Sequence, residues 1–353
     1  MDRRDFLRTS GSAAAAAGAI TPLAAAHAQG GQRTFGETAH IASGVRELGL
    51  AMSAPDNGRG AGESARRLAR RIECLTGERY RIRILSGPAA QDADMMHGSA
   101  NDHLDADAAF AFFAGLPGSH GLPPVDLDAW VAIGGGQMVW DDLAAELGWK
   151  PFLAGHSGAN PVIWSRQPLI AANGLQGLKF AADGLARDVA RGLGAQPFAV
   201  TAFEAAQALS EGRIDALEGP GAMYSLAAGL SELAPFALTA GINRQGTAQS
   251  LSVKIGVWDS MSFSEQTAVA SAAAEEFRLC CAEARAHEQL SWRVMRERHN
   301  VLVGGPVEEL SDAINRVSDA VVAHMAGASR QAQRINASFM AFKVMLPMAP
   351  AVA

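Results

Sequence analysis

The 353-residue sequence is poor in cysteine. Its three cysteines are Cys74, Cys280 and Cys281, and none of them forms the Cys-x-x-Cys spacing of a structural zinc site. An odd number of cysteines argues against a disulfide framework, and the spacings do not fit an iron–sulfur cluster. We interpret them as buried or unreactive thiols, although a disulfide from Cys74 to one of the adjacent pair stays open in an oxidising compartment.

Net positive charge is also absent. Lys and Arg number 30 against 36 Asp and Glu, which gives a formal net charge of -6. A nucleic-acid-binding protein normally carries a basic stripe, so we expect no nucleic-acid partner. With 48% hydrophobic and 19% charged residues, the chain has the composition of an ordinary globular protein, and its length predicts about two domains.

Recognisable catalytic motifs are missing as well. The run Gly134–Gln137, GGGQ, lacks the Gly-Lys-Ser/Thr ending of a phosphate-binding loop, and there is no G-x-S-x-G elbow. Ser157 has His156 beside it, but adjacent loop residues rarely form a nucleophile–base pair. Four histidines without H-x-x-x-H spacing give only a weak indication of a metal site: His97, His103, His120 and His156.

The N-terminus has the layout of an export signal. MDRRDFLRTSGSAAAAAGAITPLAAAHAQG combines a charged start, an Ala-rich middle and a small-x-small end at Ala26-His27-Ala28. Arg3-Arg4 followed by Asp5-Phe6-Leu7 resembles the twin-arginine signal. A membrane anchor fits less well, because the apolar run is short and rich in Ala and Gly. We therefore predict that residues 1–28 are a cleaved twin-arginine signal peptide and that the mature protein is periplasmic.

Helical and strand patterns alternate along the mature chain. Leu68 and Ile72 recur at helical spacing, Gly77 ends that helix, and Tyr80 and Ile82 then alternate as in a strand. Similar alternation continues to about residue 250 and predicts a parallel α/β architecture. Residues 263–353 read as mostly helical, which is typical of a segment that packs on another domain or another subunit.

Two acidic residues stand near a predicted sheet end. EGRIDALEGP places Asp215 and Glu218 three positions apart, beside a very short strand. A carboxylate there could serve a hard cation such as Na⁺ or Ca²⁺, whereas an exposed carboxylate is the commoner outcome.

One long stretch carries a family likeness. DAWVAIGGGQMVWDDLAAELGWKPFLAGHSGANPVIWSRQPL resembles the solute-binding subunits of TRAP (tripartite ATP-independent periplasmic) transporters. The likeness continues through Gly177-Leu178-Lys179, GLGAQP and EGRIDALE, and it covers roughly residues 45 to 300. The matching positions are Trp130, Gly134-Gly135-Gly136, Trp140-Asp141, Pro151-Phe152, Ala154-Gly155, Trp164 and Arg166.

The resemblance implies an α/β, two-lobed, type II-like periplasmic binding protein with a hinge. Lobe I is expected at 29–160, with part of 250–310 returning to it, and lobe II at 161–249. The lobes close over a small organic acid and pass it to a TRAP membrane permease. The branch that it looks most like binds 2-oxo acids or related carboxylates, sometimes with Na⁺ or Ca²⁺ bridging, and often forms a homodimer through a long C-terminal helix such as 263–353. No organic cofactor is implied.

The sequence departs from this family at three ligand-side positions. Ala181 stands where members usually have an arginine that grips the ligand carboxylate. Gly219-Pro220 follow Glu218 where a tryptophan is expected, and a Tyr-Tyr-x-Gly-Lys stretch before the FAFF strand is shortened to SANDHLDAD. Losing one charge-assisted hydrogen bond costs roughly 1.5–3 kcal/mol, which is about one to two decades of affinity.

By the resemblance, the candidate ligand-binding residues are Asn160, Trp164, Arg166, Lys179, Ala181 and Glu218, and Asn160 and Glu218 are also the candidate metal ligands. Trp164 suits packing better than ligand contact. Three interpretations of Ala181 stay open. The ligand is neutral or differently charged, another arginine (Arg166, Arg187 or Arg244) takes over, or the chain no longer serves transport.

The sequence therefore predicts a non-enzymatic solute receptor with altered ligand choice. Two alternatives remain. One is a non-transporting periplasmic sensor or scaffold with a degenerate pocket, and the other is a twin-arginine-exported enzyme.

Overall fold

The structure, a computed structural model, describes residues 44–53, 61–169, 174–198, 202–239, 241–305 and 308–346. The chain divides into two units, 1–43 and 44–353, and every element described here belongs to the second unit. The predicted signal peptide, with Arg3 and Arg4, lies outside the described residues.

The first sheet has the strand order β2-β1-β3-β10-β4. β1, β2 and β3 are parallel, whereas β10 is antiparallel to both β3 and β4. The strands are β1 Arg46–Met52, β2 Tyr80–Leu85, β3 Met95–Ser99, β4 Trp149–His156 and β10 Ala248–Lys254.

The second sheet has the order β11-β9-β5-β8-β6-β7. β5 runs antiparallel to β8 and β9, and the other pairs are parallel. Both sheets are therefore mixed, whereas the sequence pattern predicted parallel strands. The prediction failed on this point because an alternating pattern identifies a strand but not its direction. The strands are β5 Val162–Ser165, β6 Lys179–Ala181, β7 Gln196–Pro197, β8 Ala216–Gly219, β9 Phe236–Leu238 and β11 Leu302–Gly304.

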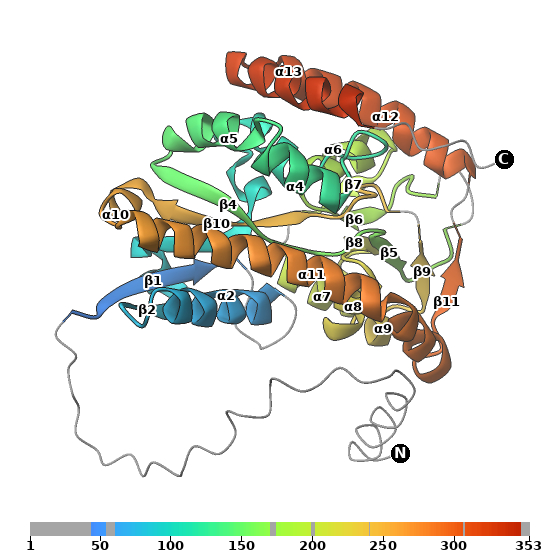
Figure 1. Ribbon diagram of the computed structural model, residues 1–353. Helices are drawn as coiled ribbons and strands as arrows, with labels where there is room; N and C mark the ends of the chain where they lie inside the picture. Colours follow the sequence, from blue (N-terminus) through green and yellow to red (C-terminus); the bar gives the residue numbers. More distant parts are fainter. Residues whose placement is uncertain are drawn as a thin grey trace, which may run out of the picture. The chain divides into compact units, whose positions relative to one another are not determined.

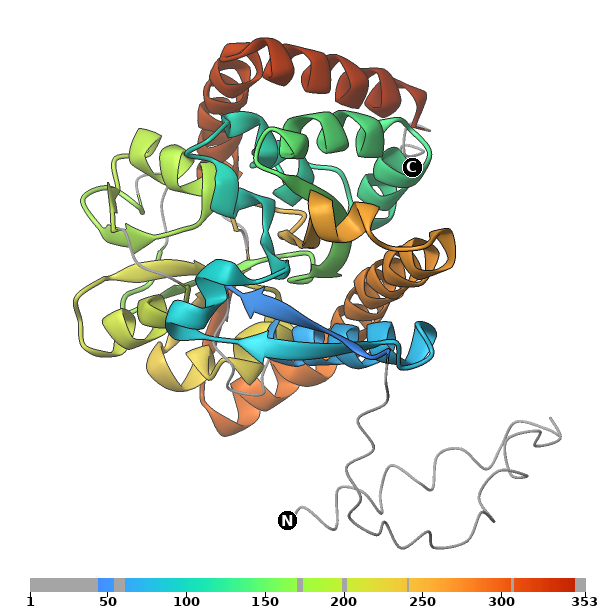
Figure 2. The ribbon, with the colours of Figure 1, turned by 90° about the vertical axis from the view of Figure 1, so that its left-hand side faces the viewer.

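Helices cover these sheets, as Figures 1 and 2 show. No helix among the described residues is long and apolar enough to span a membrane. The helices are α2 Ala61–Leu75, α3 Ala111–Ala114, α4 Pro124–Ala132, α5 Gly136–Ala145, α6 Gly184–Gly192, α7 Ala202–Ser210, α8 Ala222–Ala227, α9 Leu230–Leu233, α10 Ile255–Asp259, α11 Phe263–Arg298, α12 Glu308–Gly327 and α13 Arg330–Met345, with the 3₁₀ turns η2 Gly87–Asp92, η3 Ala100–His103 and η4 Ala108–Phe110.

The long helix α11 contacts elements of the first sheet's layer and of the second sheet's layer. It packs on β4 and α2 beside the first sheet and on α8 beside the second, and Figure 1 shows it running past both sheets. A capping box of Ser262 and Glu265 starts it. Its Glu276 is fully buried and pairs with Arg67 at 2.6 Å and Arg71 at 3.1 Å, both from α2. These ion pairs hold α11 against α2, beside the first sheet.

Two predicted elements differ from the structure. FAFF is not a strand: η4 and α3 form there, and Phe113 stacks on Trp140 with 4.6 Å between ring centroids. An apolar run of this length fits a buried helical turn as well as a strand. The C-terminal helical segment is interrupted by β11 and by Ala328-Ser329, where the Ser329 side chain caps α13.

The C-terminal helices pack on their own chain. Phe339 of α13 lies against Phe112 with 5.2 Å between the ring centroids, and Trp130 Nε1 donates a hydrogen bond of 3.2 Å to Ser338 Oγ. Figure 1 shows α13 lying along α4 and α5.

Candidate functional site

The segments that follow β3 and β6, one from each sheet, meet at the ends of these strands. Asp183 caps the N-terminus of α6, where its carboxylate accepts the Gly184 N–H at 2.7 Å. Asn101 of η3 donates from Nδ2 to the same carboxylate at 3.2 Å. A hydrogen bond thus joins the segments that follow the two sheets, at the carboxyl ends of the strands, where α/β proteins usually bind ligands.

Asn101 leaves one hydrogen-bonding atom unused. Its Oδ1 atom is buried and has no partner among the described residues. Asn243, in the crossing between β9 and β10, has the same feature: Nδ2 donates to Thr247 Oγ1 at 3.2 Å, and the buried Oδ1 has no partner in the described part of the chain. Both free atoms are acceptors, so each could take a donor from a ligand or from water.

Asp102 lies next to Asn101 and faces the same end of the strands. Its carboxylate accepts the Ser99 N–H at 3.0 Å, which completes a capping box at η3. The side chain is accessible to water, but the protein around it raises the pKa of this carboxyl by desolvation. The Ser99 N–H opposes this shift, and the nearby charge of Asp183 adds to it.

Glu218 stands near the end of β8, where Oε1 accepts the Asn243 N–H at 2.8 Å. The pKa of Glu218 is raised to about 7, mainly because burial disfavours the charged form; the nearby charge of Asp183 contributes to this rise, and the backbone hydrogen bonds with Asn243 and Ile242 oppose it. We call Asn101, Asp102, Asp183, Glu218 and Asn243 the strand-end cluster.

Ala181 and Trp164 face away from Glu218. Both are paired with Leu217 in the sheet, so their side chains lie on its face, opposite to that of Glu218. They belong to one apolar core, in which Trp164 is fully buried and donates from Nε1 to Ser225 Oγ at 3.1 Å. Trp164 therefore packs inside this core and lies away from the strand-end cluster, and a ligand-binding role for it stays a prediction.

The same core accounts for the missing tryptophan after Glu218. A Cβ atom at Gly219 would lie 2.8 Å from Leu230 Cδ1 and 2.9 Å from Trp164 Cδ1. A side chain of any size at this position therefore has no room until its neighbours move.

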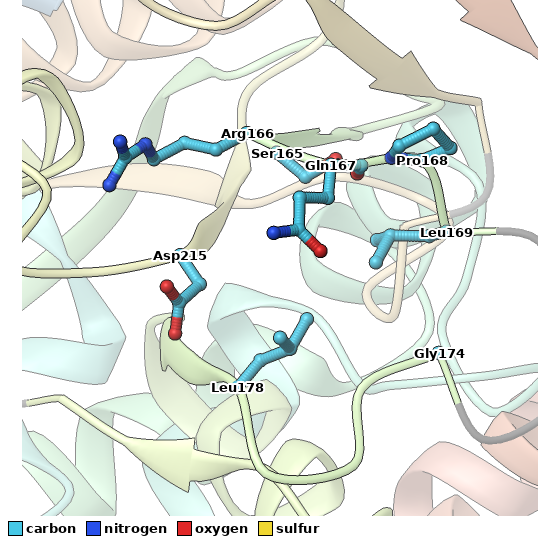
Figure 3. Close-up of a pocket in the computed structure, with 8 residues that line it drawn as sticks. All are labelled: Ser165, Arg166, Gln167, Pro168, Leu169, Gly174, Leu178 and Asp215. Atoms are coloured by element: carbon cyan, nitrogen blue, oxygen red, sulfur yellow. The ribbon is translucent and has the colours of Figure 1, made fainter.

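Arg166 and Lys179 lie at the other end of the strands of the second sheet, away from the strand-end cluster. β5 ends at Ser165 while β6 begins at Lys179, and the backbone N–H groups of Arg166 and Lys179 donate to Asp215 at 3.1 and 2.9 Å. Arg166 and Asp215 line one side of a separate cavity of about 330 Å³, with Leu169 on the other side (Figure 3). The structure thus separates Asp215 and Arg166 from the strand-end cluster.

The backbones of Asn160 and Arg244 are joined by a hydrogen bond, but the side chains of these two residues lie outside the strand-end cluster. Asn160 has a left-handed backbone (φ 57°), and its N–H donates to the Arg244 carbonyl at 3.0 Å. The exposed Asn160 lines a second cavity of about 370 Å³ together with Trp292 and Arg296. The Arg244 side chain donates to the Ser311 carbonyl at 3.4 Å. Arg187 is half-buried on α6.

The histidines do not gather. His97 and His156 are buried, and burial lowers the pKa of both, that of His156 to about 4. Within the ranges that the structure describes, there is no group of three or more His, Cys, Asp or Glu that could hold a metal ion.

Sequence reasoning missed Asn101, Asp102 and Asp183. A usable indication was present, because Ser-x-x-Asp at Ser99–Asp102 and Asp-Gly at 183–184 are both helix-start patterns that follow a strand. That the two starts meet depends on the packing of the two halves.

The chain passes from the first sheet to the second after β4, returns at β10 and passes again after α11. Two mixed sheets joined by several crossings define the class of two-lobed binding proteins. Residues 127–326, more than half of the chain, match the family described as "Bacterial extracellular solute-binding protein, family 7". The chain belongs to this family, whose members are solute-binding receptors.

Solved structures show the same fold. A TRAP transporter solute-binding protein from Bordetella bronchiseptica, a dimer with calcium and picolinate, is 22% identical, with 85% of this chain and 92% of that chain covered at a TM-score of 0.79. A Colwellia psychrerythraea protein with bound calcium and pyruvate is 21% identical (85% and 94% covered, TM-score 0.77). A Bordetella pertussis receptor that binds pyroglutamic acid is 16% identical (84% and 100% covered, TM-score 0.70).

Proposed function

We propose that this chain is the periplasmic receptor of a TRAP-type transporter. It binds a small organic solute at the strand-end cluster and delivers it to the membrane permease by closure of the two lobes. The observation that carries this proposal is the contact of Asn101 with Asp183, which brings the ligand-binding edges of both sheets together in a solute-binding family. Export by the twin-arginine route, through Arg3 and Arg4, is part of the proposal.

We place the lobes by the sheet crossings. Lobe I is 29–160 together with part of 250–310, which includes most of β10, and lobe II is 161–249 together with β11. The crossings at 157–161 and 239–247 form the hinge. Glu218 accepts a hydrogen bond from Asn243 in one of these crossings, so the proposed ligand contact of Glu218 is coupled to the hinge.

A binding screen tests the receptor function. The chain from Gln29 is melted with a panel of organic acids, amines, sugars and amino acids, with and without Ca²⁺, because similar solved structures contain calcium or sodium together with picolinate or pyruvate. A ligand at 100 times its Kd adds about 2.7 kcal/mol to stability, which shifts the melting midpoint by several degrees. A reproducible shift supports the receptor, and saturation without chemical change of the ligand supports binding without catalysis.

The alanine at 181 favours one alternative, a receptor fold kept as a sensor or scaffold. Ala181 is buried in the apolar core and offers no charge to a ligand. A panel without any shift, together with capture of a membrane partner other than a permease, would favour this alternative.

We also propose a homodimer formed through α4, α5 and α13. Large apolar side chains are exposed there, with Ile133 89%, Val125 73%, Val344 80% and Met345 72% accessible. Phe342 of α13 packs on Gly134 and so joins these helices into one surface. A second copy is the expected occupant, since the Bordetella bronchiseptica relative is a dimer.

A further inference from the structure

We propose that the solute presents a protonated amine, not a carboxylate, to the strand-end cluster. This inference rests on the proposed receptor function and specifies the class of its ligand. It differs from what the carboxylate-binding relatives would suggest, and it follows from three features of the described residues.

The first feature is charge. The cluster contains the carboxyl groups of Asp102, Asp183 and Glu218, and Asp183 lies close enough to the other two to raise the pKa of each. Among the described residues, no Lys or Arg acts on the pKa of Glu218, and the groups that lower the pKa of Asp102 are the Ser99 N–H, His103 and the Ser53 hydroxyl. A bound carboxylate would add a further negative charge to this group, whereas an ammonium would neutralise part of it.

The second feature is the kind of hydrogen-bonding atom left free. Asn101 donates one N–H of its amide to Asp183, whose negative charge faces this group, and the buried Asn101 Oδ1 has no partner among the described residues. An acceptor needs a donor, which an ammonium supplies and an ionised carboxylate cannot.

The third feature is the placement of the positive groups that could serve an anion. Ala181 replaces the expected arginine, Arg166 lies at the far edge of the second sheet, and the Arg244 side chain reaches a carbonyl of α12. The N-terminus of α6 would also favour an anion, but the carboxylate of Asp183 already accepts its first N–H. Its partial positive charge is therefore already matched by the protein.

Ligands that share a frame and differ in one group test the inference. Picolinate, 2-pyridinemethanol and 2-picolylamine carry a carboxylate, an alcohol and an amine on one ring, and butanoate, butanol and butylamine repeat this on a flexible chain. Each is titrated calorimetrically into the chain from Gln29 in buffer free of transition metals, with and without Ca²⁺. Pyruvate and pyroglutamate are titrated in parallel.

Two variants with the same charge change accompany the wild type. Asp183→Asn removes a cluster charge but keeps a good helix cap. Asp188→Asn removes a charge from the same helix, where Asp188 pairs with Arg191 outside the cluster. We expect the amine to bind at least tenfold more tightly than the alcohol and the acid to bind most weakly. Asp183→Asn should reduce amine affinity about tenfold, and Asp188→Asn should leave it unchanged.

Asn101→Ala provides a second readout that does not depend on net charge. Removing the free Oδ1 should weaken the amine and the alcohol severalfold each, because both donate a hydrogen bond. Tightest binding of a carboxylate, or amine binding that Asp183→Asn leaves intact, would overturn the inference while the receptor function stands. Absence of binding by every compound would overturn the receptor function and the inference together.

Discussion

Asn101 and Asp183 are 82 positions apart in the chain and are joined by a hydrogen bond of 3.2 Å. The two residues follow strands of different sheets, so this bond is a direct link between the lobes. In the proposed receptor function, a solute bound at the strand-end cluster contacts both residues and so adds to the same link.

The link between the lobes can be turned into a repulsion. Asn101→Asp places a second carboxylate against Asp183 and should favour an open form with a larger radius of gyration. Small-angle X-ray scattering at low salt measures this change, and added salt should reduce it. Gln333→Glu on α13 makes the same charge change outside the cluster and should leave the radius unaltered. An unchanged radius for both variants would contradict the role of the link.

Glu218 should make stability depend on pH. Its folded-state pKa of about 7 lies above the ordinary value of 4.5, so the folded chain holds the proton more tightly than the unfolded chain. The stabilisation is fully present below about pH 4.5 and is lost as the pH rises through 7.

From pH 5 to 8 the wild type should therefore lose roughly 1–3 kcal/mol relative to Glu218→Gln, by urea unfolding at each pH. The exposed Glu211, whose pKa is lowered by Arg213, gives a control: Glu211→Gln should run parallel to the wild type from pH 6 to 8. If the unfolding free energy of Glu218→Gln also ran parallel to that of the wild type across this pH range, Glu218 would not be the source of the pH dependence.

Fully buried and partly buried glutamates on α11 should differ sharply. Glu276→Gln leaves Arg67 and Arg71 without their fully buried charge partner and should cost about 2–4 kcal/mol of unfolding free energy. The neighbouring Glu275 is only partly buried and pairs with Arg278 at 2.6 Å, so Glu275→Gln should be close to neutral. Chemical denaturation of both variants makes the comparison, and equal losses would show that burial of Glu276 does not set its contribution.

Gly219 should tolerate no side chain. Gly219→Ala forces a Cβ atom to within 3 Å of Leu230 and Trp164 and should cost about 1–3 kcal/mol. Gly256 in α10 has nothing within 4 Å of the equivalent position, so Gly256→Ala should be neutral or slightly stabilising. Thermal melts of both variants test the contrast. A neutral Gly219→Ala would mean that the core around Trp164 adjusts easily.

The exposed apolar surface should control self-association. Ile133→Glu and Val344→Glu each place a charge within the surface of α4, α5 and α13 and should convert a dimer to a monomer. Leu302→Glu introduces the same charge at another exposed apolar residue, on β11, and should leave the dimer intact. Size-exclusion chromatography with light scattering gives the mass. A wild-type monomer at micromolar concentration would exclude this interface.

Local patterns predicted many of the elements well. The helix α2 and strand β2 follow from the spacing of Leu68, Ile72, Tyr80 and Ile82. The prediction of a strand at FAFF was wrong because a short apolar run fits a helix and a strand equally. β11 was missed because three residues carry too little periodicity to be recognised.

For the site, the resemblance predicted Glu218 as a candidate, and the structure places it in the strand-end cluster. The roles of all six candidates stay predictions. Strand spacing alone could not show that Arg166, which follows β5, lies at the end of the sheet's strands opposite to Glu218, because this depends on the antiparallel direction of β5.

The sequence by itself determined the family of this protein, its helices and most of its strands, because these depend on residue type and short-range spacing. It also determined that no arginine stands at position 181. Only the tertiary structure decided which polar groups face one another. Asn101 meets Asp183 and Glu218 meets Asn243 because strands from distant parts of the chain end at a common edge, and that edge is created by packing two sheets against α11.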